Sequence, residues 1–222
     1  MTETTAPRRQ RRDAAENRAG ILAAASQTLA ADPHASVDQI ARAAGLSRRA
    51  LYGHFDDRTA LVHALVSAGA ARFNAIAQRV DDADSRIALA RLTADLWREA
   101  AHVQVAAAIA LDEAHVEETA AALAPLRRVL AALVRRGQDD GELRQDMTAP
   151  TLARLIEESA RTVVTRTDAS SPVAAGIAVR AVLSIAGLGW REIDALLASH
   201  PGLAATVAPD TLATIPAEEG RA

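Results

Sequence analysis

Apolar residues recur at intervals of three and four along most of the chain, which is the period of an amphipathic α-helix. The pattern predicts a first helix from Asp13, with Ile21 and Leu29 on its apolar face, and the polar run at 32–34 ends it. Similar helical periods follow down to the region of residue 200. The expected fold is therefore all-α.

Two short helices separated by a tight turn are predicted after this first break. Ser36 is a good N-cap and Gln39 stands three positions later, so the pair can form a capping box. Gly45 supplies the left-handed backbone that ends the first of the two helices. A second helix should run from Ser47, its cap, to Phe55. Two helices joined in this way form a helix-turn-helix, whose second helix enters the major groove of DNA.

A longer helix should follow and join two parts of the molecule. Asp57 is its expected cap, and Gly69 inside it costs about 1 kcal/mol relative to Ala. Beyond an acidic break at 81–84, the pattern predicts an apolar helix over 103–111 and another helix that ends at Gly137. These helices would form the interior of a second, larger unit.

The last two long helices are predicted after Thr148 and after Pro172, and both have wide apolar faces. Such faces can serve a core and also an interface between two subunits. The pattern alone leaves open the alternative that they only complete the core of a monomer.

Composition and charge restrict the function. Half of the 222 residues are hydrophobic but only 2% are aromatic, so aliphatic side chains must build the core. The absence of Cys excludes disulfides and thiolate sites. The net charge of −3 argues at first against nucleic acid, yet residues 1–60 carry nine Arg against seven acidic residues. There is no Lys, and the planar guanidinium group of Arg can bind phosphate or guanine through two hydrogen bonds.

Ten residues in and just after the helix-turn-helix carry a resemblance to a known family. They are Ala41, Gly45, Leu46, Ser47, Leu51, Tyr52, His54, Phe55, Arg58 and Leu61. In this pattern the chain resembles the TetR family of bacterial transcriptional regulators. The resemblance implies an all-α homodimer, in which each subunit joins a DNA-binding domain to a larger domain that dimerises and binds a small-molecule inducer.

Pattern and resemblance together predict four segments of the chain. They are a flexible arginine-rich arm at 1–12, a three-helix helix-turn-helix DNA-binding domain at 13–60, a helical ligand-binding and dimerisation domain at 61–205, and a disordered tail at 206–222. The arm has two interpretations of equal weight. It can reach phosphates or a neighbouring minor groove, or it can be a solvated tail.

Nine residues are candidates for contacts with double-stranded operator DNA. They are Ser36, Ser47, Arg48, Arg49, Ala50, Tyr52, Gly53, His54 and Arg58. The two adjacent arginines suit guanine or phosphate, Ala50 and Gly53 allow close approach to a thymine methyl group, and hydroxyl or imidazole donors suit phosphates. As alternatives, Tyr52 packs within the domain and the two serines are only helix caps, although both roles can coexist.

Arg58 stands at the start of the fourth helix, where the TetR family usually places Lys. A helix N-terminus is a natural phosphate site, and a guanidinium group should preserve such a contact. Asp56 and Asp57 lie beside it, so some repulsion of the phosphate is expected.

Catalytic and metal-binding patterns are weak. The histidines lack metal-ligand spacing, and the chain has neither a nucleophile elbow nor a glycine-rich phosphate loop. Asp112, Glu113, His115 and Glu117 could be imagined as a metal cluster, but adjacent residues on a helix point in different directions. We expect no catalytic residue, metal or cofactor, and therefore no enzyme. No leader and no apolar run long enough to cross a membrane is apparent, which predicts a cytoplasmic protein without membrane contact.

Two classes of function remain. The first is a DNA-binding regulator, by the default of the family a repressor that a small-molecule inducer releases from its operator. The second is an all-α ligand-binding or interaction protein without operator recognition. Arg48, Arg49 and the capped helix-turn-helix favour the first, while the sequence names neither the inducer nor the residues that bind it.

Overall fold

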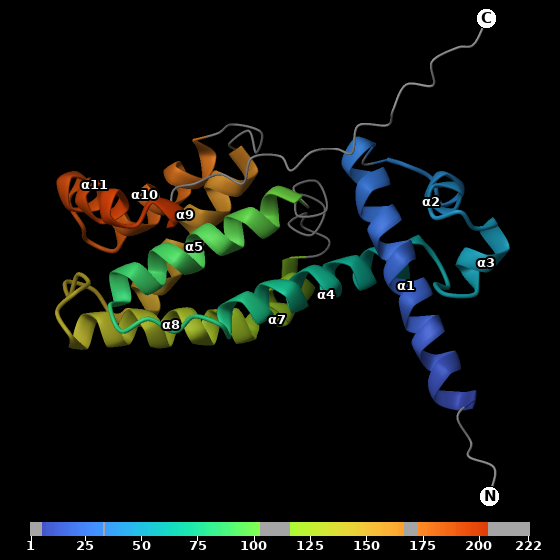
Figure 1. The fold of residues 1–222 in the computed structure, drawn as a ribbon, viewed down its shortest axis with the longest axis horizontal. Coiled ribbons are helices and arrows are strands. Elements are labelled where there is room, and N and C mark those ends of the chain that lie inside the picture. Colours follow the sequence, from blue (N-terminus) through green and yellow to red (C-terminus); the bar gives the residue numbers. More distant parts are fainter. Residues whose placement is uncertain (1–5, 33, 103–115, 167–172, 204–222) are drawn as a thin grey trace, which may run out of the picture.

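Ten α-helices and one short 3₁₀-helix account for the regular structure in the computed structural model, which describes residues 6–32, 34–102, 116–166 and 173–203. No strand occurs in these ranges, so the all-α prediction is confirmed there. The helices form a small N-terminal unit and a larger C-terminal bundle, and α4 runs from one to the other (Figure 1).

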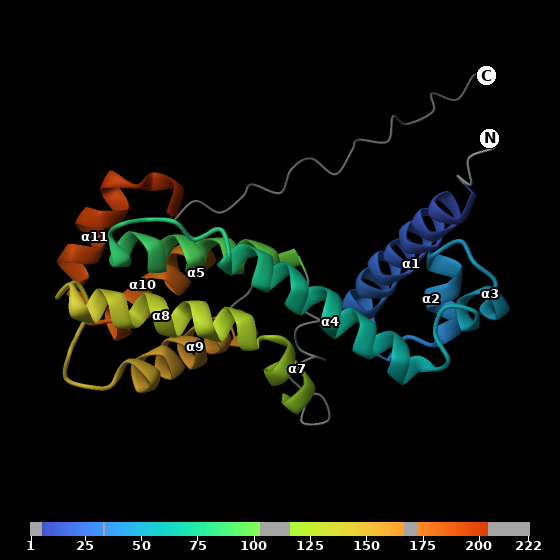
Figure 2. The same ribbon diagram turned by 90° about the horizontal axis from the view of Figure 1, so that it is seen from below.

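The N-terminal unit contains α1 (Ala6–Ala31), α2 (Val37–Ala43), α3 (Arg48–Tyr52) and the first turns of α4 (Arg58–Ala77). These elements share one apolar core, formed by Ile21, Ala25, Leu29, Ala35, Ile40, Ala41, Leu51, Phe55 and Leu61. The three-helix arrangement predicted from the hydrophobic pattern therefore forms, and it places α3 at the end of the molecule away from the bundle (Figures 1 and 2).

The first helix begins earlier than predicted. It starts at Ala6, so residues 6–12, which were assigned to a flexible arm, belong to α1. The physical reason is that Ala, Arg and Gln are strong helix formers, and Pro7 stands in the first turn, where its missing N–H leaves no bond unmade.

The linking helix α4 is continuous across Gly69, as the capped pattern predicted. Among the helices of the described ranges, α4 alone has the length and apolarity of a membrane span, with 20 residues and a mean hydropathy of 1.3. By itself this is weak evidence of a membrane, because a core helix of a soluble protein passes the same test. Here Leu61 and Ile76, near its two ends, are buried in the cores of the two units.

The C-terminal bundle contains α5 (Ser85–His102), α7 (Val116–Ala122), α8 (Ala124–Asp139), α9 (Ala149–Arg166), α10 (Ala174–Ile185), α11 (Trp190–Ser199) and the 3₁₀-helix Pro201–Leu203. In this bundle α10 packs against α5, α9 and α11, and α8 packs against α4, α5 and α9. Figure 2 shows α8 lying between α5 and α9. The two apolar helices predicted after Thr148 and Pro172 are α9 and α10.

One helix end was predicted wrongly. The hydrophobic pattern predicted a helix end at Gly137, but α8 continues to Asp139, and Gly141, with a φ of 71°, follows its C-cap. Gly137 is instead a point of close packing, because a Cβ there would lie 2.6 Å from Cγ of Leu143 and 2.9 Å from Cβ of Ser85. The glycine was required by a tertiary contact and not by the helix end.

Three expectations fall outside the described residues. They are the apolar helix at 103–111, most of the imagined metal cluster at 112–117, and the tail at 206–222.

Candidate nucleic-acid interface and internal cavity

Local hydrogen bonds fix both ends of α2, and the residues that form them are recognisable in the sequence. Oγ of Ser36 accepts from the backbone N of Gln39 at 3.3 Å, and Oε1 of Gln39 accepts from the backbone N of Ser36 at 2.7 Å, which completes the capping box. At the other end of α2, Gly45 has a φ of 69° and Leu46 N donates to the carbonyl O of Ala41 at 2.8 Å. This is the Schellman arrangement that closes a helix on a left-handed glycine.

Helix α3 is shorter than predicted. It is capped by Ser47, whose Oγ accepts from Ala50 N at 3.2 Å, but it ends at Tyr52 and not at Phe55. The chain must turn because Asp57, only a few residues later, takes an extended backbone to cap α4, and Gly53 is a poor helix former. Leu51 and Phe55 are buried, as predicted, and they fix α3 on the core of the N-terminal unit.

The candidate DNA-binding residues divide by position. Arg48, Arg49, Tyr52 and Gly53 are exposed on or next to α3, whereas Ala50 and His54 are half-buried. Ser36, Ser47 and Arg58 are exposed at the starts of α2, α3 and α4. Tyr52 is 37% exposed, so its ring lies on the surface and not in the core.

Arg48 is held by neighbours from two helices. Its Nε lies 3.3 Å from Oδ1 of Asp38 in α2, and its guanidinium group lies 5.5 Å from the centre of the Tyr52 ring. A hydrogen bond to Tyr52 and the charge of Asp38 both raise the pKa of Arg48. Asp38 was not among the predicted site residues, since ten positions separate it from Arg48 and the pair is formed only when α2 and α3 cross.

Arg18 of α1 is a second residue that the sequence did not single out. Its Nη1 donates to the carbonyl O of His54 at 3.0 Å, and its guanidinium group lies 4.2 Å from the centre of the Phe55 ring. It therefore ties the segment after α3 to α1. No local pattern could have identified it, because 36 residues separate the donor and the acceptor.

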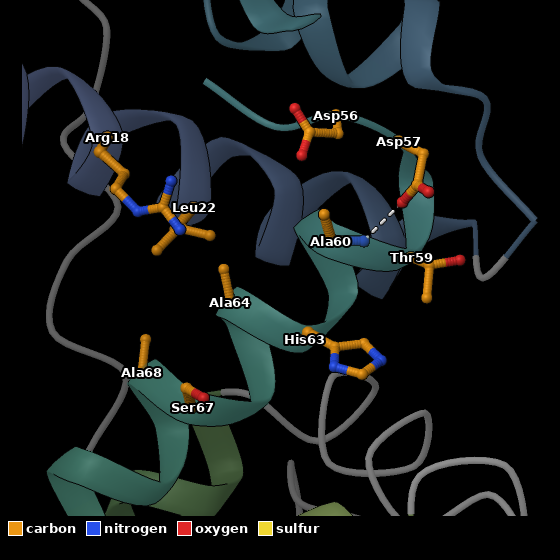
Figure 3. Close-up of a pocket in the computed structure, with 10 residues that line it drawn as sticks. All are labelled: Arg18, Leu22, Asp56, Asp57, Thr59, Ala60, His63, Ala64, Ser67 and Ala68. Carbon is orange, nitrogen blue, oxygen red and sulfur yellow. Dashed lines mark hydrogen bonds between the residues drawn. The ribbon is translucent and has the colours of Figure 1, made fainter. Parts of the chain in front are cut away.

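A surface cleft of about 710 Å³ lies between α1 and the first turns of α4 (Figure 3). Arg18 lines one side, and Asp56, Asp57 and His63 line the α4 side. Asp57 caps α4, because its Oδ1 accepts from Ala60 N at 2.7 Å. Two carboxylates therefore stand close to Arg58, as the sequence predicted.

A second, mostly apolar cavity of about 350 Å³ lies inside the C-terminal bundle. Its wall comes from α4, α5, α7, α8 and α9, with single residues from α1 and α10. Leu65, Val66, Gly69 and Phe73 contribute the α4 side, and Trp97 and Thr93 are among the α5 residues. The sequence named no ligand-binding residue, because these side chains look like ordinary core positions in the pattern.

Residues 21–65 match the family model described as bacterial regulatory proteins, tetR family. This range contains α2, α3 and both caps. The DNA-binding unit is that of a TetR-family transcriptional regulator. The recognition proposed from the ten residues around the helix-turn-helix is thereby confirmed, and the family is one of regulators and not of enzymes.

Solved structures of TetR-family proteins share the fold along most of the chain. A TetR family transcriptional regulator, PfmR from Thermus thermophilus, is 21% identical, with a TM-score of 0.65 over 75% of this chain and 96% of its own. The fatty acid degradation regulator FadR from Bacillus halodurans is 21% identical, with a TM-score of 0.67 over 79% and 96%. FadR from Bacillus subtilis, in complex with stearoyl-CoA, is 15% identical, with a TM-score of 0.65 over 76% and 97%. No curated protein sequence matches the chain.

Proposed function

We propose that this TetR-family regulator represses transcription by binding a palindromic operator as a homodimer, in the cytoplasm, and that a small molecule in the bundle cavity releases it. The observation that carries the proposal is the position of α4. This helix lines the cavity with Leu65, Val66 and Gly69 and places Leu61 in the core of the DNA-binding unit. A ligand in the cavity therefore contacts a helix whose first turns belong to the core of the unit that carries α3.

The exposed face of α3 supports operator recognition. Arg48 and Arg49 project from a capped helix whose buried side is fixed by Leu51, which is the geometry needed to present side chains to base edges. Arginine binds the O6 and N7 atoms of guanine through two hydrogen bonds. Phosphate contacts from Ser36, Ser47 and Arg58 would fix the position of the protein along the DNA duplex.

Apolar side chains on α9 and α10 support a homodimer. Leu155 is 44% exposed on α9, Ile177 is 43% exposed on α10, and Val173, which precedes α10, is 60% exposed. Burying such a patch against a second copy gives a twofold dimer. The two α3 helices must then lie about 34 Å apart, or a multiple of it, to enter successive major grooves.

The first experiment is a binding assay with DNA fragments that flank the gene, at two salt concentrations, with unrelated DNA as control. We expect one palindromic fragment to be bound more tightly than unrelated DNA at both concentrations. The reason is that contacts with the bases add to the salt-dependent binding free energy that comes from phosphate contacts. Equal, salt-sensitive binding to all fragments would contradict operator recognition. No binding to any fragment would favour the alternative, a ligand-binding protein without an operator.

Two variants separate the roles of the arginines. Arg49→Ala should lower the affinity unequally across operator sequence variants, because a base contact is lost. Arg58→Ala should weaken binding to all of them alike, because only a phosphate contact is lost. Affinities for a set of single-base operator variants measure both effects, and insensitivity to both changes would contradict the proposed interface.

A further inference from the structure

We infer that Asn74 is a positioning residue, which carries a displacement of the α7–α8 junction, residues 119–126, to α4. This inference rests on the proposed function, since it names the residue through which the cavity acts on the DNA-binding unit. It is carried by two hydrogen bonds of one side chain and by the position of the junction in the cavity wall.

Asn74, on α4, bonds to the end of one helix and to the start of the next. Its Nδ2 donates to the carbonyl O of Ala122, the last residue of α7, at 2.9 Å. Its Oδ1 accepts from the backbone N of Leu126, in the first turn of α8, at 3.0 Å. A carbonyl group only accepts and a backbone N–H only donates, so both ends of this half-buried amide are matched to their partners.

The start of α8 depends on the bond to Leu126. The first N–H groups of a helix have no partner inside it, and an N-cap side chain usually accepts from one of them. Here the N-cap residue is Leu123, which makes no side-chain cap bond, and Pro125 in the first turn has no N–H. Oδ1 of Asn74 therefore takes the place of an N-cap side chain, although 52 positions separate Asn74 from Leu126.

The same junction forms part of the cavity wall. Thr119, Ala120, Leu123 and Leu126 line the cavity from this side. A ligand in the cavity therefore contacts the segment that Asn74 holds. An N–H···O hydrogen bond holds its N and O atoms within about 2.7–3.2 Å, so a junction that moves by about 1 Å either takes α4 with it or breaks both bonds. Asn74 thus gives the cavity a second route to α4, besides the α4 side chains that line the cavity themselves.

The test fills the cavity from the α7 side by mutation, in the full chain and without a ligand. Ala120→Trp enlarges a half-buried side chain of the wall, and overpacking shifts the backbone that carries it. We expect amide hydrogen exchange over residues 58–66 of α4 to become about tenfold faster when Asn74 is present. In the Asn74→Leu background we expect a change of less than about twofold, because the two sites are then uncoupled. Hydrogen-exchange mass spectrometry measures both.

Asn74→Asp is the second variant, and it keeps the shape of the side chain. Its carboxylate still accepts from Leu126 N but cannot donate to the carbonyl O of Ala122. We expect its response to Ala120→Trp to fall between those of wild type and Asn74→Leu.

Two matched controls test whether the coupling is specific. Ala160→Trp fills the same cavity from α9, and its effect on residues 58–66 should be the same with and without Asn74. Gln78→Leu removes an amide from the exposed end of α4 and should leave the response to Ala120→Trp intact. An equal response to Ala120→Trp in wild type and in Asn74→Leu would overturn the inference. So would no response in wild type, or an Ala160→Trp effect that depends on Asn74 to the same extent.

The operator assay separates this inference from the proposed function. If Ala120→Trp loosens α4 only when Asn74 is present, but wild type binds no operator, the role of Asn74 stands and the proposed function is contradicted. If Ala120→Trp weakens operator binding equally in wild type and in Asn74→Leu, operator recognition stands and the role of Asn74 is contradicted.

Discussion

At the scale of single residues, Asp38 is the acidic neighbour of a proposed DNA contact. It keeps the guanidinium group of Arg48 close to the Tyr52 ring, and its charge also repels phosphates. We expect Asp38→Asn to raise affinity for unrelated DNA and to lower discrimination for the operator by about fivefold, the size of one exposed ion pair. The ratio of the two affinities at constant salt measures this.

Asp146→Asn is the control for that change. It removes the same charge from a pair with Arg144, which lies in the C-terminal bundle. An equal loss of discrimination in both variants would show that net charge, and not the position of Arg48, is responsible.

Residue by residue, the caps were predictable and the cross-helix pairs were not. Ser36 with Gln39, Ser47 and Asp57 act within three positions of the backbone N–H groups that they satisfy, so the sequence identifies them directly. The Asp38–Arg48 pair and the hydrogen bonds of Asn74 depend on how helices cross. Neither is visible in a local pattern.

At the scale of helices, Asp84 stabilises the start of α5. Its Oδ1 accepts from the backbone N of Arg86 at 2.8 Å and of Ile87 at 3.3 Å, and its side chain also binds the guanidinium group of Arg86. We expect Asp84→Ala to lower the free energy of unfolding by about 1 kcal/mol at neutral pH, as loss of an N-cap does. Urea unfolding followed by circular dichroism measures it, with the exposed Asp81→Ala as control.

This stabilisation should depend on pH. The side-chain hydrogen bond from Arg86, helped by backbone hydrogen bonds, lowers the pKa of Asp84 in the folded state. The contribution is therefore fully present above the ordinary Asp value of about 3.9 and disappears as the pH falls through the lower folded pKa. Repeating the unfolding series in acid should show wild type approaching Asp84→Ala, and a constant difference would contradict this.

Gly69 offers a test of α4. A Cβ added there would meet nothing within 4 Å, and the position is helical and lines the cavity. We expect Gly69→Ala to raise stability by up to about 1 kcal/mol, the difference in helix propensity. Thermal unfolding measures it, and Gly20→Ala in α1, also with open space around the Cβ, should behave alike. A destabilised Gly69→Ala protein beside a stabilised Gly20→Ala protein would mean that α4 lacks this free space.

Helix ends show where local patterns are misleading. The hydrophobic pattern placed the long apolar helices α9 and α10, yet a glycine at 137 was taken as a stop when packing against Leu143 required it. The early start of α1 shows the opposite error, in which a charged run was taken as a tail although its residues favour helix.

At the scale of the whole molecule, the proposed dimer makes DNA binding depend on assembly. Ile177→Glu places a charge in the exposed apolar patch of α9 and α10, so we expect monomers and a loss of operator binding. Analytical ultracentrifugation gives the mass and the operator assay gives the affinity. Ala132→Glu, exposed on α8, is the control that should remain dimeric. An Ile177→Glu protein that stays dimeric would place the interface elsewhere.

Under the proposed function, the shared helix α4 works as a lever. Phe73, the last residue of α4 that lines the cavity, lies about 22 Å along the helix from Arg58, so a tilt of about five degrees at Phe73 moves the start of α4 by about 2 Å. That displacement is close to the H···O distance of a hydrogen bond, so it is enough to break contacts between side chains and bases. Under the proposed function, a ligand that pushes Leu65 and Val66 aside by the width of one methyl group therefore shifts α3 out of register on the DNA, without any change inside the N-terminal unit itself.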